Sequence, residues 1–107
     1  MKEIKAVIQP FMLEKVLDAL AAIEGLPGLT VSHVQGWGRA RSTGDAGHGL
    51  AAECKIEIIV ADEDAERVIA AIAMAARTGR PSDGKIFVLD VEDVLRIHTG
   101  VRGADAV

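Results

Sequence analysis

The sequence predicts an α+β fold, because segments with the two-residue period of strands alternate with segments that have the period of helices. Each helical segment carries one apolar stripe, and the last strand segment is apolar on both faces. A chain of 107 residues has the size of one domain, so we expect residues 1–107 to share a single core.

The first part of the chain predicts a strand, a helix and a second strand. Apolar and polar residues alternate over residues 2–9, and Pro10 ends this strand. Apolar residues then recur at helical spacing over residues 13–23, with the charged residues on the other side. A turn rich in glycine and proline follows, and β-branched, alternating character resumes at Leu29.

A glycine-rich stretch follows the second strand. Residues 36–53 hold five of the 11 glycines without a sustained period, which is typical of a functional surface loop. We expect its projecting part at about residues 39–53. Residues 54–61 predict a third strand, and the next helix has its apolar stripe between Ala65 and Ala76. Acidic residues 62–64 lie where a helix N-terminus favours negative charge.

The remaining residues predict one more strand and a tail. A loop over residues 77–84 leads to a fourth strand over residues 85–91. The C-terminal segment, about 92–107, predicts a short turn of helix, a brief strand over residues 96–98 and an irregular end.

This order of elements predicts a ferredoxin-like βαββαβ sandwich, in which both helices cover one face of an antiparallel sheet. The other face then has no helix on it, although the fourth strand is apolar on both sides. We therefore expect the open face to pack against copies of the same chain, which makes the protein an oligomer.

Charge and composition exclude several classes of function. A net charge of −4 and a pI near 5.3 argue against nucleic acid as a partner, and only 3% of the residues are aromatic side chains that could stack on bases. The single cysteine, Cys54, has no partner for an internal disulfide. No stretch predicts a signal peptide or direct membrane insertion, so we expect a cytoplasmic protein.

The loop before the fourth strand combines glycines with cations. Gly79 and Gly84 would let backbone amides approach an anion, and Arg80 and Lys85 would neutralise it, as a phosphate site requires. The spacing is not that of a Walker loop. On pattern alone, a helix-to-strand connection with solvated charges is favoured.

Two further clusters carry weaker signals. Gly36, Trp37, Gly38 and Arg39 form a G-x-G that follows a strand without opening a helix, so a glycine-requiring bulge is the alternative to a ligand loop. Alternation predicts that Arg96 and His98 share one side of a strand, and both could equally be solvated.

Metal binding and catalysis have little support in the pattern. His33, His48, His98 and Cys54 are scattered without the close spacing of a zinc site, although a site between subunits or at His48 stays open. Cys54 is expected to pack as a small apolar side chain. No residue stands out as a positioned general base, so we predict that the protein is not an enzyme.

The three clusters, around Arg80 and Lys85, around Gly36 to Arg39 and around Arg96 and His98, all belong to one family pattern. The chain resembles the P-II signalling family over nearly its whole length, through "MKEIKAVIQPFMLEKVLDALA", "GWGR", "KIEIIVADEDAERVIAAIAMAARTG" and "DGKIFVLDVEDVLRIHTG". The resemblance implies a homotrimer for nitrogen regulation that binds ATP or ADP, and AMP as a further candidate, in clefts between subunits. It also implies a projecting loop that contacts a target protein such as a membrane transporter.

The resemblance also implies roles for single residues. Gly38 and Arg39 match loop-base residues that meet phosphate, and Gly84 and Lys85 match a glycine and lysine that face the phosphates. Arg96 matches a phosphate-binding arginine that reaches across the subunit boundary. The nucleotide-binding residues implied in this way are Thr30, Gly36, Gly38, Arg39, Glu57, Ile59, Thr78, Gly84, Lys85, Arg96 and His98.

The chain departs from the family pattern at several positions. The projecting loop is shortened and holds no tyrosine, which excludes control by uridylylation of a loop tyrosine. Ala40 replaces a glutamine that helps to hold magnesium and 2-oxoglutarate, and Glu53 aligns with a lysine typical of the 2-oxoglutarate site. His98 and Ser82 replace an arginine and a glycine. We therefore expect that the protein does not sense 2-oxoglutarate in the usual way and that its nucleotide preference is changed. Whether magnesium takes part stays open at this level.

Two other functions stay open at this level. One is a metal-responsive or divalent-cation-tolerance trimer linked to metal transport, which a cluster of His48, His33 and Cys54 in the assembled trimer would favour. The other is slow ATP hydrolysis, which has the least support because no general base is evident.

Overall fold

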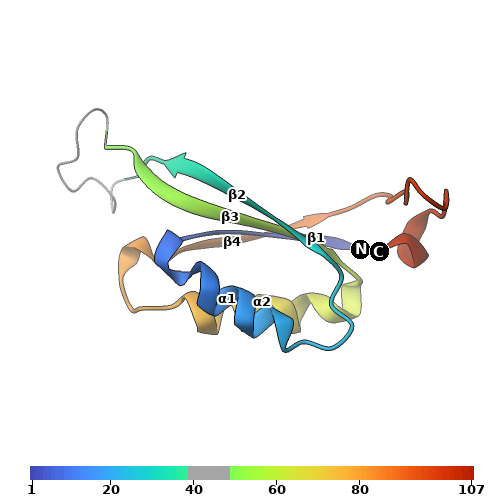
Figure 1. The fold of residues 1–107 in the computed structure, drawn as a ribbon, viewed down its shortest axis with the longest axis horizontal. Coiled ribbons are helices and arrows are strands. Elements are labelled where there is room, and N and C mark those ends of the chain that lie inside the picture. Colours follow the sequence, from blue (N-terminus) through green and yellow to red (C-terminus); the bar gives the residue numbers. More distant parts are fainter. Residues whose placement is uncertain (39–48) are drawn as a thin grey trace.

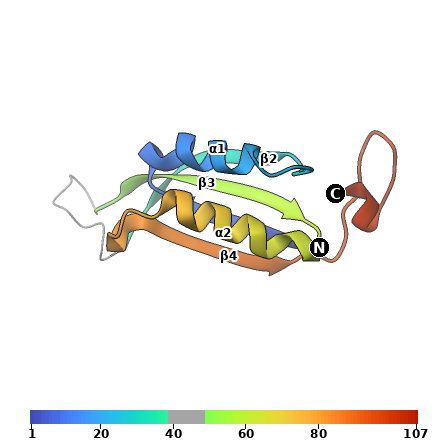
Figure 2. The same cartoon turned by 90° about the horizontal axis from the view of Figure 1, so that it is seen from below.

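The computed structural model describes residues 1–38 and 49–107, in which four strands form one antiparallel sheet. The strands are β1 (Lys2–Ile8), β2 (Leu29–Gly36), β3 (Ala51–Val60) and β4 (Gly84–Asp90), and the helices are α1 (Leu13–Ala21) and α2 (Ala65–Ala76). The strand order is β2-β3-β1-β4, and both helices lie side by side on one face of the sheet (Figures 1 and 2). The predicted ferredoxin-like fold is confirmed.

The core lies between the sheet and the two helices. In β1 and β3 every second side chain points toward the helices, and the register pairs Ile4 with Ile58, so that the apolar sets coincide. Each fully buried Ile or Leu contributes roughly 1.5–3 kcal/mol. The largest fully buried side chains are Ile4, Ile8, Val16, Leu20, Cys54, Ile56, Ile58, Val60, Val68 and Ile72.

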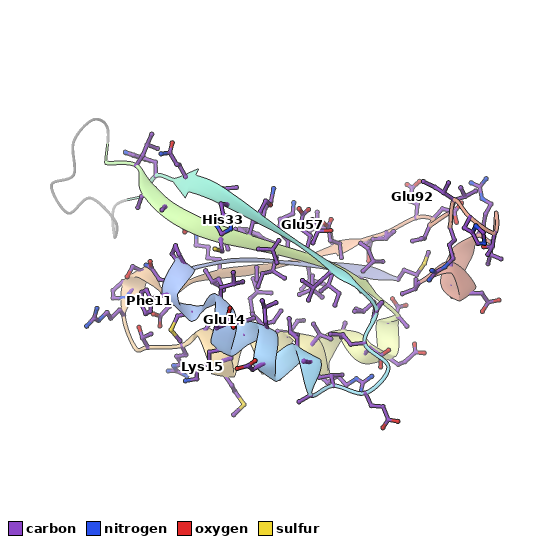
Figure 3. All side chains as sticks on the ribbon, in the orientation of Figure 1. Phe11, Glu14, Lys15, His33, Glu57 and Glu92 are labelled. Atoms are coloured by element: carbon purple, nitrogen blue, oxygen red, sulfur yellow. The ribbon has the colours of Figure 1, made fainter. Side chains whose placement is uncertain are left out.

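The opposite face of the sheet has no helix on it among the described residues (Figure 1). One row crosses all four strands there: Thr30 pairs with Glu57, Glu57 with Lys5, and Lys5 with Phe87. Glu57 points away from the helices (Figure 3). In this row the open face therefore presents polar side chains on β2, β3 and β1 and an apolar one on β4.

Several predicted boundaries shift by a few residues. β3 begins at Ala51 and not at residue 54, because its backbone pairs with the full length of β2, up to the pair of Gly36 and Ala51. The part of the predicted loop that runs from residue 51 to residue 53 is therefore strand. Helix α1 ends at Ala21 and not at Ile23, whose amide bonds instead to Leu20 O at 3.0 Å in a tighter turn.

The prediction for the C-terminal segment is wrong in its elements. Residues 96–98 form no strand; they run into a turn between Leu95 and Arg102, which pair as an isolated bridge. The amide of Arg96 donates to Val101 O at 2.9 Å, and a one-turn 3-10 helix covers Gly103–Ala106. Arg96 and His98 therefore do not share one side of a strand. None of the described helices is long and apolar enough to cross a bilayer.

Candidate nucleotide site on the open face of the sheet

The loop between α2 and β4 is closed by one carboxylate. Asp83 Oδ2 accepts hydrogen bonds from the amides of Thr78 at 2.7 Å and Gly79 at 3.0 Å, and its other oxygen accepts from the Thr78 hydroxyl. The bonds from the Thr78 side chain and backbone lower the pKa of Asp83. The loop is therefore shaped by its own side chains, and both donors of Thr78 are used within it.

Gly84 is required by the packing of two strands. Its φ of 115° lies in the left-handed region, and a β-carbon there would overlap the carbonyl oxygen of Val7 and lie 3.2 Å from the Cα of Ile8. The glycine thus lets β4 start directly against β1. Its presence has a structural cause, whatever ligand approaches the loop.

Five of the predicted site residues line two separate hollows of the open face. The first, here called the Lys85 hollow, has a volume of about 240 Å³ and is lined by Val7, Trp37, Glu53, Pro81, Gly84, Lys85 and Phe87. The second, here called the Glu57 hollow, has a volume of about 390 Å³ and is lined by Pro27, Gly28, Thr30, Glu57, Ile59, Val94, Ala106 and Val107. No predicted residue lines both.

The Glu57 hollow holds hydrogen-bonding groups beside an apolar wall. Glu57 forms an ion pair with Lys55 at 3.7 Å, and its strand neighbour Ile59 supplies apolar surface. Hydrogen bonding to Glu57, together with burial, raises the pKa of Glu3, which lies one strand away. A carboxylate, the Thr30 hydroxyl and the apolar side chain of Ile59 suit a ligand that carries amino or hydroxyl groups on a ring.

The Lys85 hollow combines a cation with a buried carboxylate. Glu53 is only 4% exposed, and its side chain lies across Gly36, where a β-carbon would come within 2.6 Å of the Glu53 Cδ. This contact, rather than a bulge, is the structural reason for glycine at position 36. Trp37 lines the hollow yet is 69% exposed, so its indole remains open to a ligand.

Sequence reasoning missed the apolar walls of both hollows. Val7, Phe87, Val94 and Ala106 line them, and Trp37 was noted only as part of a G-x-G pattern. For the strand residues a signal existed, because the odd-numbered residues of β1 and β4 must share the face opposite the core. For Val94 and Ala106 there was no signal, since the tail has no period.

The other predicted site residues either line neither hollow or lie outside the described residues. Arg96 and His98 are exposed in the C-terminal turn and line neither hollow. No atom of the described residues lies within 4 Å of the place where a β-carbon of Gly38 would be. Arg39 lies outside the described residues, as do Ala40 and His48.

The described part of the chain brings only two of the candidate metal ligands together. The Nδ1 of His33 lies 3.4 Å from the Sγ of Cys54 on the neighbouring strand, and Cys54 is fully buried as predicted. Among residues 1–38 and 49–107, no three His, Cys, Asp or Glu side chains are grouped as a metal site requires.

Comparison with known proteins identifies the family. The family model described as nitrogen regulatory protein P-II matches residues 1–101. Proteins of that name from Rhizobium meliloti (strain 1021) and Pasteurella multocida (strain Pm70) are 46% and 42% identical to the chain, with full coverage of both partners. Each of these alignments spans 113 positions against the 107 residues here, so the chain lacks six positions of the alignment.

A solved structure agrees with the sequence matches. The PII protein of Arabidopsis thaliana, in a crystal structure bound to citrate, superposes with a TM-score of 0.84 at 40% identity, over 99% of this chain and 91% of that one. Together these matches show that the chain belongs to the nitrogen regulatory protein P-II family, whose members are signalling regulators and not enzymes.

Proposed function

We propose that this regulator receives its signal as an adenine nucleotide, ATP or ADP, bound in clefts between three copies of the chain in the cytoplasm. The observation that carries the proposal is the division of five of the expected binding residues between two hollows on one open face. A site formed between copies explains this division, since the Lys85 hollow of one chain would complete the Glu57 hollow of the next.

The open face supports self-association. Phe87 and Leu89 are 46% and 40% exposed there, on a strand that also forms the edge of the sheet. Exposed apolar side chains next to each other on a sheet face are typical of an interface. Burial of these side chains between copies would bring the hollows of neighbouring chains together.

The two hollows would bind different parts of the nucleotide. The ammonium group of Lys85, beside the glycine-containing loop, suits the phosphates. The carboxylate of Glu57 and the hydroxyl of Thr30 suit the amino and hydroxyl groups of the nucleoside, and Ile59 suits the face of the base. Discrimination of ATP from ADP, and a response to AMP, would then depend on the Lys85 hollow.

The same geometry argues against a usual response to 2-oxoglutarate. Glu53 contributes a carboxylate to the Lys85 hollow, where a dicarboxylate would meet like charge at close range. The Arabidopsis relative binds citrate, which is also a carboxylate ligand. We propose that this chain, in contrast, does not respond to a carboxylate ligand. A target protein such as a membrane transporter would then respond to nucleotide binding alone, through contacts with the loop after β2.

Isothermal titration of the mass-checked oligomer with ATP, ADP and AMP tests the proposal, each with and without magnesium and 2-oxoglutarate. We expect saturable binding near one nucleotide per chain that 2-oxoglutarate does not change. Lys85→Ala should weaken binding about tenfold or more, because a charge-assisted contact to phosphate is lost. Lys15→Ala, which removes an exposed lysine from α1, is the matched control. Absence of binding for all three nucleotides would overturn the proposal.

A further inference from the structure

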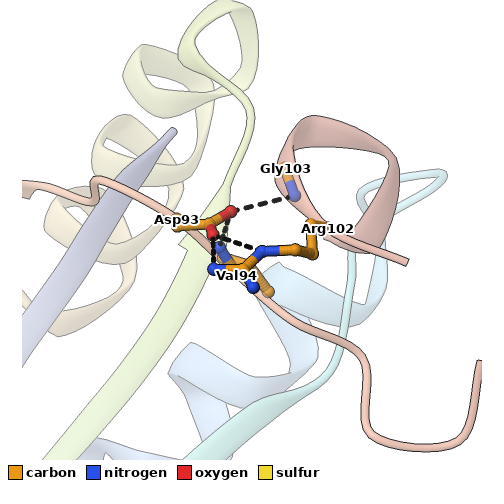
Figure 4. Close-up of polar contacts among 4 residues, drawn as sticks. All are labelled: Asp93, Val94, Arg102 and Gly103. Atoms are coloured by element: carbon orange, nitrogen blue, oxygen red, sulfur yellow. Dashed lines mark hydrogen bonds and ion pairs between the residues drawn. The ribbon is translucent and has the colours of Figure 1, made fainter. Parts of the chain in front are cut away.

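One carboxylate gathers four hydrogen bonds at the start of the C-terminal segment (Figure 4). Asp93 Oδ2 accepts from Nε of Arg102 at 2.8 Å and from its Nη2 at 2.5 Å. Asp93 Oδ1 accepts from the amides of Val94 at 2.9 Å and Gly103 at 3.1 Å. The bond from Arg102 is the main cause that lowers the pKa of Asp93. We call Asp93 and Arg102 the clamp.

The clamp closes the segment into a loop with a defined shape. Gly103 N donates to Val94 O at 2.9 Å, and Leu95 pairs with Arg102, so the chain returns on itself beside the clamp. Val94 begins the closed loop and Ala106 lies three residues after its end at Gly103, and both line the Glu57 hollow. Ala106 is buried, whereas most of the loop between them is exposed.

We propose that Asp93 and Arg102 are positioning residues of the nucleotide site: the clamp holds Val94 and Ala106 in place as the outer wall of the Glu57 hollow. The inference rests on the proposed nucleotide binding at that hollow. Neither residue of the clamp lines the hollow, so both act through the segment that they close.

The geometry separates this pair from an ordinary surface ion pair. Exposed pairs contribute little because two flexible side chains must be ordered for one contact. Here the guanidinium makes two bonds to a single oxygen, while the second oxygen holds two backbone amides across a gap of nine residues in sequence. Loss of the carboxylate therefore frees the amides of Val94 and Gly103 as well as the arginine, and so weakens the return of the chain.

Titration of ATP into the oligomer, followed by the emission of Trp37, tests the inference. Trp37 is the single tryptophan of the chain and lies in the Lys85 hollow, so it reports on the phosphate end. Asp93→Ala should raise the ATP dissociation constant about tenfold, the effect of losing a charge-assisted bond, while the amplitude of the emission change at saturation stays the same. Asp93→Asn keeps an acceptor for the amides. Its ATP dissociation constant should therefore lie between those of the wild-type protein and Asp93→Ala.

Arg102→Gln should give a smaller loss than Asp93→Ala, because the two amide bonds to Asp93 persist. Arg67→Gln is the control, since Arg67 lines neither hollow. It removes the 2.9 Å ion pair with Asp64, just before α2, and a hydrogen bond to Glu24 O. Hydrogen exchange at the amides of Val94 and Gly103 should accelerate in Asp93→Ala without nucleotide.

The outcomes distinguish the two proposals. If the unchanged protein binds ATP and Asp93→Ala binds it equally well, the clamp inference fails and the proposed function stands. If Asp93→Ala loses the emission amplitude or the oligomeric mass, its role is structural and the inference is also wrong. If the unchanged protein binds no nucleotide, the proposed function fails together with the inference that rests on it.

Discussion

The side chain of Glu53 occupies the space above Gly36, where a β-carbon would lie 2.6 Å from Cδ and closer still to Oε1. The contact joins two adjacent strands at the edge of the Lys85 hollow, since Gly36 ends β2 and Glu53 lies near the start of β3. A glycine in one strand therefore makes room for a buried carboxylate in the next.

Gly36→Ala is expected to lower the free energy of unfolding by roughly 1–3 kcal/mol, because Glu53 must leave its buried position. Urea denaturation followed by circular dichroism measures the loss. In a Glu53→Ala background the space is empty, so the same substitution should cost clearly less, and a double-mutant cycle isolates the difference. Equal costs in both backgrounds would show that the two side chains do not compete.

Gly84→Ala is expected to be more destabilising, by at least about 2 kcal/mol, since backbone and not a flexible side chain blocks the added carbon. The methyl group would meet the carbonyl of Val7, and φ at Gly84 is 115°. Thermal unfolding compares it with Gly28→Ala, where no atom lies within 4 Å of the added carbon. The control should change stability by less than about 0.5 kcal/mol. Similar losses for the two variants would contradict the assignment of strain to Gly84.

The sequence predicted the regular part of the fold because its signal is periodic. Ile4 and Ile58 follow the two-residue period that places them in the core, and both helices appeared from their stripes. The C-terminal turn was missed because it depends on one carboxylate, that of Asp93, bonding across nine residues to Arg102, which no local pattern reveals. Local periodicity in the sequence predicts which side chains are buried, whereas the shape of the C-terminal segment depends on long-range hydrogen bonds that have no local pattern.

For the candidate site, the sequence names residues but not their arrangement. The resemblance supplied Thr30, Glu57 and Lys85, but a motif does not state which of its residues meet within one chain. That answer comes from strand order, because Glu57 lies on β3 and Lys85 on the far edge strand β4. A site completed by a neighbouring copy cannot be distinguished from an internal one by sequence spacing alone.

Glu3 predicts a specific pH dependence of stability. Hydrogen bonding to Glu57 and burial raise its pKa in the folded state above the unfolded value of about 4.3. The folded state then binds more protons than the unfolded state, so the free energy of unfolding should fall as the pH rises from about 4 through the raised pKa. Glu3→Gln should remove this decline and be more stable than the unchanged protein at pH 7.

Urea midpoints at a fixed protein concentration between pH 4 and pH 7 provide the measurement, because assembly would otherwise shift the apparent stability. Glu92→Gln makes the same chemical change on the exposed C-terminal segment and serves as the control. Parallel curves for Glu3→Gln and the unchanged protein would show that the carboxyl of Glu3 is not coupled to that of Glu57.

Phe87→Asp is expected to prevent self-association through the open face. Phe87 lies in the row with Lys5 and Glu57, and a second copy packed against it would have to bury the new carboxylate. Even beside Lys5 on the neighbouring strand, a carboxylate buried in an interface loses its hydration at a cost that the ion pair does not recover, and the apolar contact of Phe87 is lost as well. Light scattering coupled to size exclusion should therefore show the mass of one chain, while circular dichroism retains the signal of the folded protein.

Met74→Asp adds the same charge at a position of α2 that is 79% exposed, and it should leave the mass of the oligomer unchanged. An unchanged mass in Phe87→Asp would place the interface elsewhere, and loss of assembly in Met74→Asp would place it on the helical layer.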